Sequence, residues 1–364
     1  MGCLENEIRI TCLGDLLASD TDYSTGTGIS SKMGNLLEYY GQHENNLFNG
    51  SDIVICNLES PLITDISVHQ LPFAGNPSIV KLMKILNVSV TNLANNHILD
   101  HGKEGFQQTI SLLSDNNIKY TGSMEDSVSR IVFLEFRNKK IALAGFNAIP
   151  DHPDNTFIAP LERDILFNTL NEIKKQSPDY IVYSFHWGNE YVSWPSPEQV
   201  DLAHELIDNG VNIIIGHHPH VVQPVEKYNG GVIMYSLGNF LFDMFWSETV
   251  RNGIQVDLFL NNDKSINYTL KHFRIRTDFT HDYINTDAGV SIYEKSNRKF
   301  EQLLEGPRQL YERAYHSECK RRRLMARLNM KLFLIRNLFN LSRVSRGILL
   351  ENLKKKSIHF WTRN

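Results

Sequence analysis

Short apolar runs rich in β-branched residues alternate with amphipathic stretches along the first 220 residues. Such runs predict buried strands, and apolar residues spaced three and four apart predict helices with one buried face. After Pro77, for example, four apolar residues from Ile79 to Leu86 fall on one helix face. Strands are expected at Ile8–Leu13, Asp52–Asn57, Ser89–Leu93, Ile118–Tyr120, Tyr180–Phe185 and Val211–Ile215. The alternation predicts an α/β fold.

Further helices are expected at Gly105–Leu113, Leu161–Lys175 and Ser196–Asn209. Ser196 suits an N-cap, Pro197 suits the first helical position, and Gly210 ends the helix. Arg130–Glu135 and Ile141–Gly145 flank a basic turn and predict a β-hairpin. From Val221 to Ile275 strand follows strand, which predicts a second sheet packed on the first. Residues 278–290 are expected to be a loop-rich connection to C-terminal helices.

Clusters of polar residues directly follow the C-terminal ends of the predicted strands. In α/β folds the functional loops gather at that edge of the sheet. The clustered side chains are carboxylates, one amide and several imidazoles, a ligand set typical of Mn, Fe, Zn or Mg. A shared carboxylate could hold two such ions about 3.5–4 Å apart. The candidate residues are Asp15, Glu59, Asn96, His97, His186, His218 and His220.

Taken singly, these residues also have ordinary structural explanations. Asp15 and Glu59 could cap the helices that follow them, and His186 could be a hydrogen-bonded, half-buried residue at a strand end. The densest signal is the segment from His217 to His220, although a solvated histidine-rich loop is the alternative. In an extended backbone, side chains two apart share a face, so two of its imidazoles could meet one ion. The joint occurrence at one sheet edge favours a metal site.

The order of these motifs resembles that of the CapA family of poly-γ-glutamate capsule biosynthesis, which is similar in fold to calcineurin-like metallophosphatases. The resemblance covers roughly residues 8–275 and rests on Gly14-Asp15, Asn57-Leu-Glu59, Ala94-Asn-Asn-His97 with Asp100 and Gly102, His186-Trp-Gly188 with Glu190-Tyr191, Gly216-His-His-Pro-His220 with Gln223-Pro224, and Tyr235-Ser-Leu-Gly-Asn-Phe240 with Asp243. It implies an αββα sandwich of two packed sheets flanked by helices. It also implies a metal-dependent hydrolase of phosphoester or acyl/amide bonds in capsule, poly-γ-glutamate or exopolysaccharide biosynthesis, acting on a cell-surface polymer precursor or an anionic polymer.

The resemblance also implies a metal-binding role for six residues. Asp15 would bind one ion and Glu59 would bridge both. The second ion would be held by Asn96 and His186 with His218 beside them, and His220 would return to the first. His217 could replace His218 in this scheme, but the His-x-His spacing favours His218 with His220.

Two further residues are implied in catalysis. His97 would face the substrate as a general acid or charge stabiliser. Asp100 would orient His97, because a partner on the far ring nitrogen fixes the tautomer.

The chain departs from the family pattern in three places. Leu17 stands where typical metallophosphatases have a histidine, and Glu59 stands where they have an aspartate. Many family members have an N-terminal membrane anchor, and we expect none in this chain. These departures favour an alternative function, a non-catalytic accessory subunit of a membrane-associated polymer-synthesis complex.

Composition adds an expectation about the compartment. Hydrophobic residues make up 41% and charged residues 21%, as in ordinary globular proteins with a large core. Four cysteines without a C-x-x-C pair do not form a disulfide framework, and Cys12 and Cys56 are expected to be buried thiols. Neither a signal peptide nor a membrane-spanning apolar stretch is found. We expect a cytoplasmic protein, or one peripheral at the inner face of the membrane.

Charge is divided sharply along the chain. Residues 319–364 hold 13 Lys and Arg and one acid, whereas the first 318 residues hold 24 bases against 40 acids. From Leu324 to Leu338 apolar residues recur at steps of 4, 4, 3 and 3, with bases on the other faces. This basic amphipathic helix could lie on an anionic membrane surface, bind a synthesis-complex partner or dock on the protein's own body.

A nucleic acid is the least favoured partner of this helix, because aromatic residues are sparse in the basic stretch. We predict three parts of the chain: a metallophosphatase-fold domain at 1–277, a connecting segment at 278–318 and a basic tail at 319–364.

Overall fold

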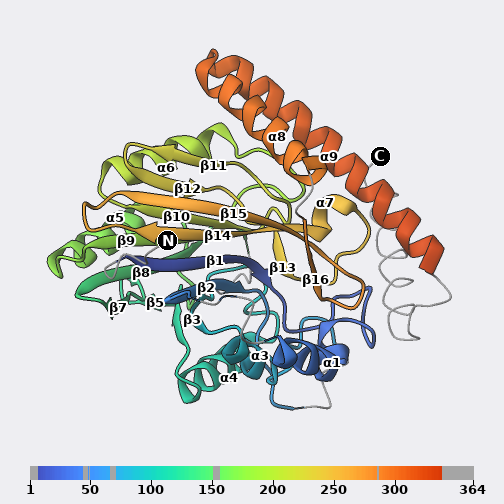
Figure 1. Cartoon of the computed structure of the whole chain (residues 1–364). Helices are drawn as coiled ribbons and strands as arrows, with labels where there is room; N and C mark the ends of the chain where they lie inside the picture. Colours follow the sequence, from blue (N-terminus) through green and yellow to red (C-terminus); the bar gives the residue numbers. More distant parts are fainter. Residues whose placement is uncertain are drawn as a thin grey trace.

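Two large β-sheets pack face to face, with helices on their outer sides (Figure 1). The structure, a computed structural model, describes residues 7–43, 48, 50–65, 71–150, 156–284 and 287–337. The first sheet has the order β16 (His281–Tyr283), β15 (Ile266–Ile275), β14 (Asn252–Leu260), β1 (Ile8–Leu16), β2 (Ile53–Leu58), β3 (Val88–Asn92) and β4 (Lys119–Thr121), and β13 (Asn239–Leu241) also pairs with β1. The predicted αββα sandwich is confirmed.

The second sheet has the order β11 (Val225–Tyr228), β12 (Gly231–Met234), β10 (Ile213–His217), β9 (Tyr180–His186), β8 (Lys139–Asn147) and β7 (Val132–Phe136). A small hairpin joins β5 (Met124–Glu125) to β6 (Val128–Ser129). The helices are α1 (Ile29–Gln42), α3 (Ile79–Ile85), α4 (Gly102–Asp115), α5 (Arg163–Lys175), α6 (Pro197–Asp208), α7 (Glu248–Arg251), α8 (Asp287–Glu305) and α9 (Arg308–Asn337).

Three apolar layers hold these elements together. One lies between the two sheets and includes Ile10, Ile55 and Ile215. A second lies between the first sheet and α1, α3 and α4, and a third between the second sheet and α5, α6, α8 and α9. Cys12 and Cys56 are completely buried free thiols, as the sequence predicted.

The strands after Val221 do not form a sheet of their own, which corrects the sequence-based expectation. β11 and β12 extend the sheet of β8, β9 and β10, whereas β14 and β15 join the sheet of β1. In that sheet β14 runs antiparallel to β1, with Ile8 opposite Leu260. The predicted hairpin is confirmed as β7 and β8, which pair Glu135 with Lys140.

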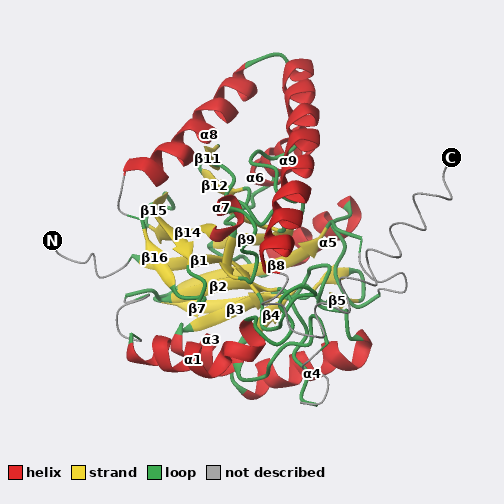
Figure 2. Cartoon of the chain, turned by 90° about the vertical axis from the view of Figure 1, so that its right-hand side faces the viewer, coloured by secondary structure: helices red, strands yellow, loops and turns green. Residues whose placement is uncertain are grey.

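The C-terminal part forms two long helices, α8 and α9, that pack on the outside of the sandwich (Figure 2). The expected loop at 278–290 is wrong in part, since it contains β16 and α8 begins at Asp287. The basic helix expected from Leu324 is the second half of α9, and Leu338 lies outside the described residues. The division at residues 277 and 318 stays a prediction. Within the described ranges, no helix is long and apolar enough to cross a bilayer.

Candidate metal centre

The predicted ligands come together at one edge of the sandwich. Asp15 lies near the end of β1, Glu59 directly after β2, His186 at the end of β9 and His218 directly after β10. Asn96 follows β3 and its Oδ1 lies 2.8 Å from the Nε2 of His186. Each parallel strand therefore delivers a side chain from its carboxyl end, so that both sheets contribute to one site.

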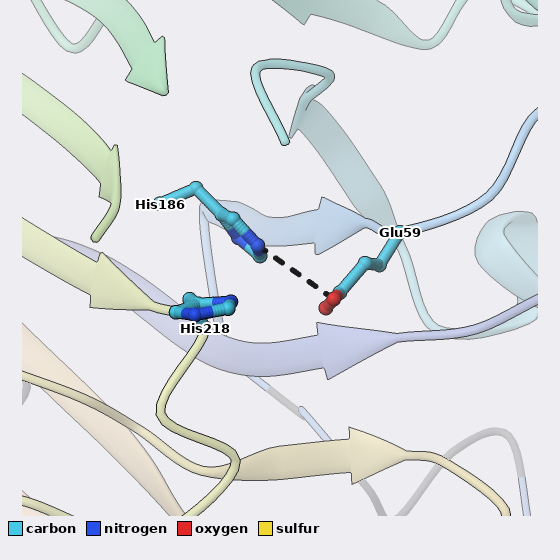
Figure 3. A group of neighbouring side chains, drawn as sticks. All are labelled: Glu59, His186 and His218. Atoms are coloured by element: carbon cyan, nitrogen blue, oxygen red, sulfur yellow. Dashed lines mark ion pairs between the residues drawn. The ribbon is translucent and has the colours of Figure 1, made fainter. Parts of the chain in front are cut away.

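Among the described residues, three overlapping groups of side chains could hold a metal ion. In each group, one ligand atom from every residue lies within 4.8 Å of the others. Figure 3 shows the group of Glu59, His186 and His218, in which the imidazoles and the carboxylate face one another. The other groups are Asp15, Glu59 and His220, and Glu190, His218 and His220. Glu59 belongs to two of the groups, so its carboxylate lies between two sets of ligands.

Neighbouring polar groups fix the orientation of the ligands. Asn57 donates a hydrogen bond of 2.9 Å from its amide to Asp15, and the Nδ1 of His217 lies 3.1 Å from the same carboxylate. The Nδ1 of His220 lies 2.8 Å from the Oδ1 of Asn239. The other nitrogen of His220 consequently faces Glu59, with its Nε2 3.6 Å from Oε1.

Burial determines the electrostatics of the site. It raises the pKa of Glu59 well above its usual value, and the charge of Asp15 adds to the rise. Burial and neighbouring imidazoles lower the pKa of His186 well below its usual value and bring that of His218 to about 3. For Asp15, burial is outweighed by the hydrogen bond and charge of His217, and the pKa is lowered. His186 and His218 are therefore neutral near pH 7, the form that binds metals.

Two buried ligand atoms lack a hydrogen-bond partner. They are Oε1 of Glu59 and Nδ1 of His218, and both belong to the group in Figure 3. A buried polar atom without a partner is costly, at about 1–3 kcal/mol. A divalent cation would satisfy both atoms, so the donor set fits a metal.

Backbone conformation brings the strand ends close enough to form the site. A Cβ on Gly14 would lie 1.9 Å from the carbonyl oxygen of Gly238, so only glycine allows this approach of β1 to the segment before β13. The extended backbone expected around Pro219 is wrong. His218 and His220 have φ of 91° and 54°, a left-handed conformation that L-residues avoid. The ring centroids of His218 and His220 nevertheless lie 5.9 Å apart. The left-handed backbone at both residues places the two rings at the same edge of the sheet.

The two residues implied in catalysis lie outside these metal groups. The Nδ1 of His97 lies 2.8 Å from Oδ2 of Asp100, and its ring stacks on Phe73 with centroids 4.0 Å apart. The side chains of His97 and Asp100 are partly exposed, at 24% and 31%. This arrangement leaves the Nε2 of His97 as the free end of a positioned ring.

Three contributors had no role in the sequence-based ligand scheme. Glu190 forms a ligand group with His218 and His220. Asn57 donates a hydrogen bond to Asp15, and the amide oxygen of Asn239 lies against His220. All three lie inside the motifs on which the resemblance rests. The signal for Glu190 is an acid four residues after His186, in the loop that leaves the same strand end.

A model of the family described as "Bacterial capsule synthesis protein PGA_cap" matches residues 9–244. The chain belongs to this family. This PGA_cap chain is 34% identical over 220 residues to the PGA biosynthesis protein CapA of Bacillus subtilis (strain 168), covering 57% of this chain and 58% of that protein. It is 33% identical over 234 residues to the capsule biosynthesis protein CapA of Bacillus anthracis, covering 58% and 56%. The chain thus spans less than two thirds of the length of these relatives.

Among solved structures, the PGA_cap chain is similar to a phosphatase of Mycoplasma pneumoniae, with a TM-score of 0.47 and 14% identity. That match covers 79% of this chain and 97% of the other. Family membership confirms the resemblance that the motifs indicated.

Proposed function

We propose that this PGA_cap protein is a metal-dependent hydrolase that cleaves a phosphoester or an acyl/amide bond during synthesis of a capsule polymer. The observation that carries the proposal is the position of Glu59 in two ligand groups at once, with its buried Oε1 unpaired. A carboxylate shared between two such groups is the usual arrangement of a two-metal hydrolase. The substrate class is a cell-surface polymer precursor or an anionic polymer.

Under this proposal the two ligand groups divide the work of holding two divalent ions. Asp15, Glu59 and His220 would hold one, while His186 and His218 would hold the other with Glu59 and Asn96. When bound, such ions polarise a phosphoryl or carbonyl oxygen and lower the pKa of a water molecule toward 7. The low pKa of His218 means that it offers a neutral ring without first releasing a proton.

The role proposed for His97 is to stabilise charge on the substrate or to give it a proton. The carboxylate of Asp100 accepts from Nδ1 of His97, and Phe73 holds the ring plane. The hydrogen bond and the stacking leave Nε2 as the only ring nitrogen free to contact the substrate. His97→Gln is expected to lower turnover by about 10²–10⁴-fold with its metal content unchanged.

The first test is elemental analysis of the purified chain beside His218→Ala and Glu59→Ala. About two metal equivalents in the parent, lost in both variants, would support the metal centre. His204→Ala is the matched control, since His204 pairs with Glu226 at 3.0 Å outside the site. A parent that holds no metal, and takes up neither Mn²⁺ nor Zn²⁺, would refute the catalytic proposal. Hydrolysis of phosphoesters and γ-glutamyl amides is then compared between the parent and Asp15→Ala.

A second candidate function is a non-catalytic accessory subunit of a polymer-synthesis complex at the inner face of the membrane. It is favoured by Leu17, which is fully buried in the apolar layer and stands where typical metallophosphatases have a histidine. Complementation separates the two functions in a strain that lacks its own copy. Capsule production restored by Asp15→Ala would favour the accessory role, and loss of capsule with that variant would favour the hydrolase.

A further inference from the structure

Exposed apolar side chains are concentrated on one helix. Of the seven large apolar residues that the described part of the chain exposes, six lie in α9. Five of the six lie in its second half, and we name these five the outer stripe: Leu324, Met325, Leu328, Leu332 and Ile335, exposed by 60%, 47%, 46%, 50% and 69%. Contiguous exposed apolar surface of this kind marks an interaction site.

The outer stripe is not the face by which α9 packs on the protein. Met330 and Phe333 pack against the apolar layer of α1 and the first sheet, while Tyr311 and Tyr315 are buried against the second sheet. At 100° per residue, Phe333 lies on the opposite side of the helix from Leu324. α9 lies along the outside of the sandwich (Figure 1). Its inner face packs on the body, and the outer stripe is on the opposite, exposed face.

Positive charge surrounds the outer stripe. Residues 319–337 hold seven Lys and Arg and no acid. By helical position, Arg327 and Lys331 flank the stripe on one side and Arg336 on the other. All three are exposed, and none forms an ion pair with a side chain in the described ranges. Their charge is thus available to an anionic surface.

We propose that the outer stripe and its flanking bases dock the protein on an anionic lipid bilayer. An amphipathic helix of this kind lies in the interface, with its apolar face in the headgroup and acyl boundary. Each Lys or Arg near an anionic surface adds attraction, and here the bases border the apolar face on both sides. The sequence left open whether the apolar face docks on the protein's own body. In the described part of the chain, the outer stripe does not dock on the body.

This proposal is independent of the metal centre. Binding is measured on the full chain by co-sedimentation with vesicles that contain phosphatidylglycerol, and with vesicles of phosphatidylcholine alone. We expect binding to the first kind only, weakened as salt increases. Leu328→Gln with Leu332→Gln is expected to weaken it about tenfold or more. Leu71→Gln is the control, because Leu71 is 49% exposed but lies outside α9.

A second pair of variants tests the charge without touching an apolar residue. Arg327→Gln with Lys331→Gln is expected to weaken vesicle binding about tenfold, whereas Lys32→Gln with Lys84→Gln on α1 and α3 is expected to leave it unchanged. Equal loss in stripe and control variants, or equal binding to both vesicle types, would overturn the proposal. The proposal would also be overturned if the protein did not bind vesicles and instead formed a dimer, and if Leu328→Gln with Leu332→Gln dissociated that dimer.

Discussion

The two ring nitrogens of His220 have different neighbours, and this difference determines how the residue can bind a metal. Nδ1 lies 2.8 Å from the amide oxygen of Asn239, which favours a proton on Nδ1 and leaves Nε2 as the electron-pair donor. The amide of Asn239 is held in turn by a hydrogen bond of 2.9 Å to the carbonyl of Val250. Asn239 therefore positions His220 without being a ligand.

Asn239→Ala is expected to weaken metal binding by about 10–100-fold, because the ring loses the partner that fixes its tautomer. Titration of the metal-free chain with Mn²⁺ or Zn²⁺ measures the change. Asn261→Ala is the control, since the side-chain amide of Asn261 donates to the hydroxyl of Ser265 in an exposed turn. An unchanged affinity in the Asn239 variant would show that the hydrogen bond has no influence on the metal.

Asp243 illustrates a buried acid that is held at a cost in stability. It is 1% exposed, and one carboxylate oxygen accepts from Ser24 and from the backbone of Thr21 while the other has no hydrogen-bond partner. Burial raises its pKa to about 7, although those hydrogen bonds lower it. The folded protein therefore keeps the proton at pH values where the unfolded chain has lost it, so stability falls as the pH rises from about 4 to about 7.

Asp243→Asn removes this titration. We expect the variant and the parent to be equally stable near pH 4, and the variant to be more stable at pH 8 by up to about 4 kcal/mol. Urea unfolding at both pH values measures the difference, with Asp115→Asn on the exposed face of α4 as the control. A parent whose stability relative to the variant does not change with pH would contradict the raised pKa.

At the scale of elements, α6 shows how local sequence determines a helix boundary. Ser196 accepts from the backbone of Gln199 at 3.2 Å, Gln199 accepts in return from the backbone of Ser196 at 2.8 Å, and Pro197 takes the first position. This capping box confirms the sequence-based N-cap. It satisfies two backbone donors that the first turn would otherwise leave unpaired.

Ser196→Ala is expected to lower the free energy of unfolding by about 1 kcal/mol, since the cap hydrogen bond is lost. Ser78→Ala is a matched control, because Ser78 is the N-cap of α3 but forms no side-chain cap hydrogen bond. Chemical denaturation compares both variants with the parent. Equal losses in the two variants would mean that the cap of α6 contributes nothing specific.

The local sequence pattern predicted the positions of the helices and strands better than it predicted which strands pair with one another. The strands β1, β2, β9 and β10 and the helices α3 and α6 follow from apolar spacing and capping residues. The place of β14 beside β1 does not, because alternation shows which face of a strand is buried and not which strand pairs with it. Chain order favours pairing between strands that are near in sequence, whereas β1 and β14 are far apart in the chain.

The same limit applies to the candidate site. Asp15, Glu59 and His186 could be identified because each ends or follows a recognisable strand. The left-handed backbone at His218 and His220 could not, since residues with a side chain rarely adopt it without tertiary contacts that hold them there. Glu190 lies in a loop, where no periodic pattern indicates the direction of a side chain.

At the scale of the whole molecule, α9 is connected to the loop beside the candidate metal centre. Asn189 donates to the hydroxyl of Tyr315 at 2.7 Å and accepts from Arg323 at 2.6 Å, and both of these residues belong to α9. The next residue is Glu190, which contributes to one ligand group. The helix proposed to dock on lipid thus shares direct hydrogen bonds with the loop that carries a candidate ligand.

The position of β1 between β2 and β14 also has a consequence for biosynthesis. A ribosome adds about 5–20 residues per second, so β1 emerges roughly 10–50 s before the strand that covers its second edge. A chain that ends after Trp246 lacks β14 altogether and is expected to collect in the insoluble fraction on expression. If it remained dispersed and monomeric, the exposed edge of β1 would be harmless. Otherwise the yield of the full chain is expected to depend on how long chaperones protect the nascent N-terminal half.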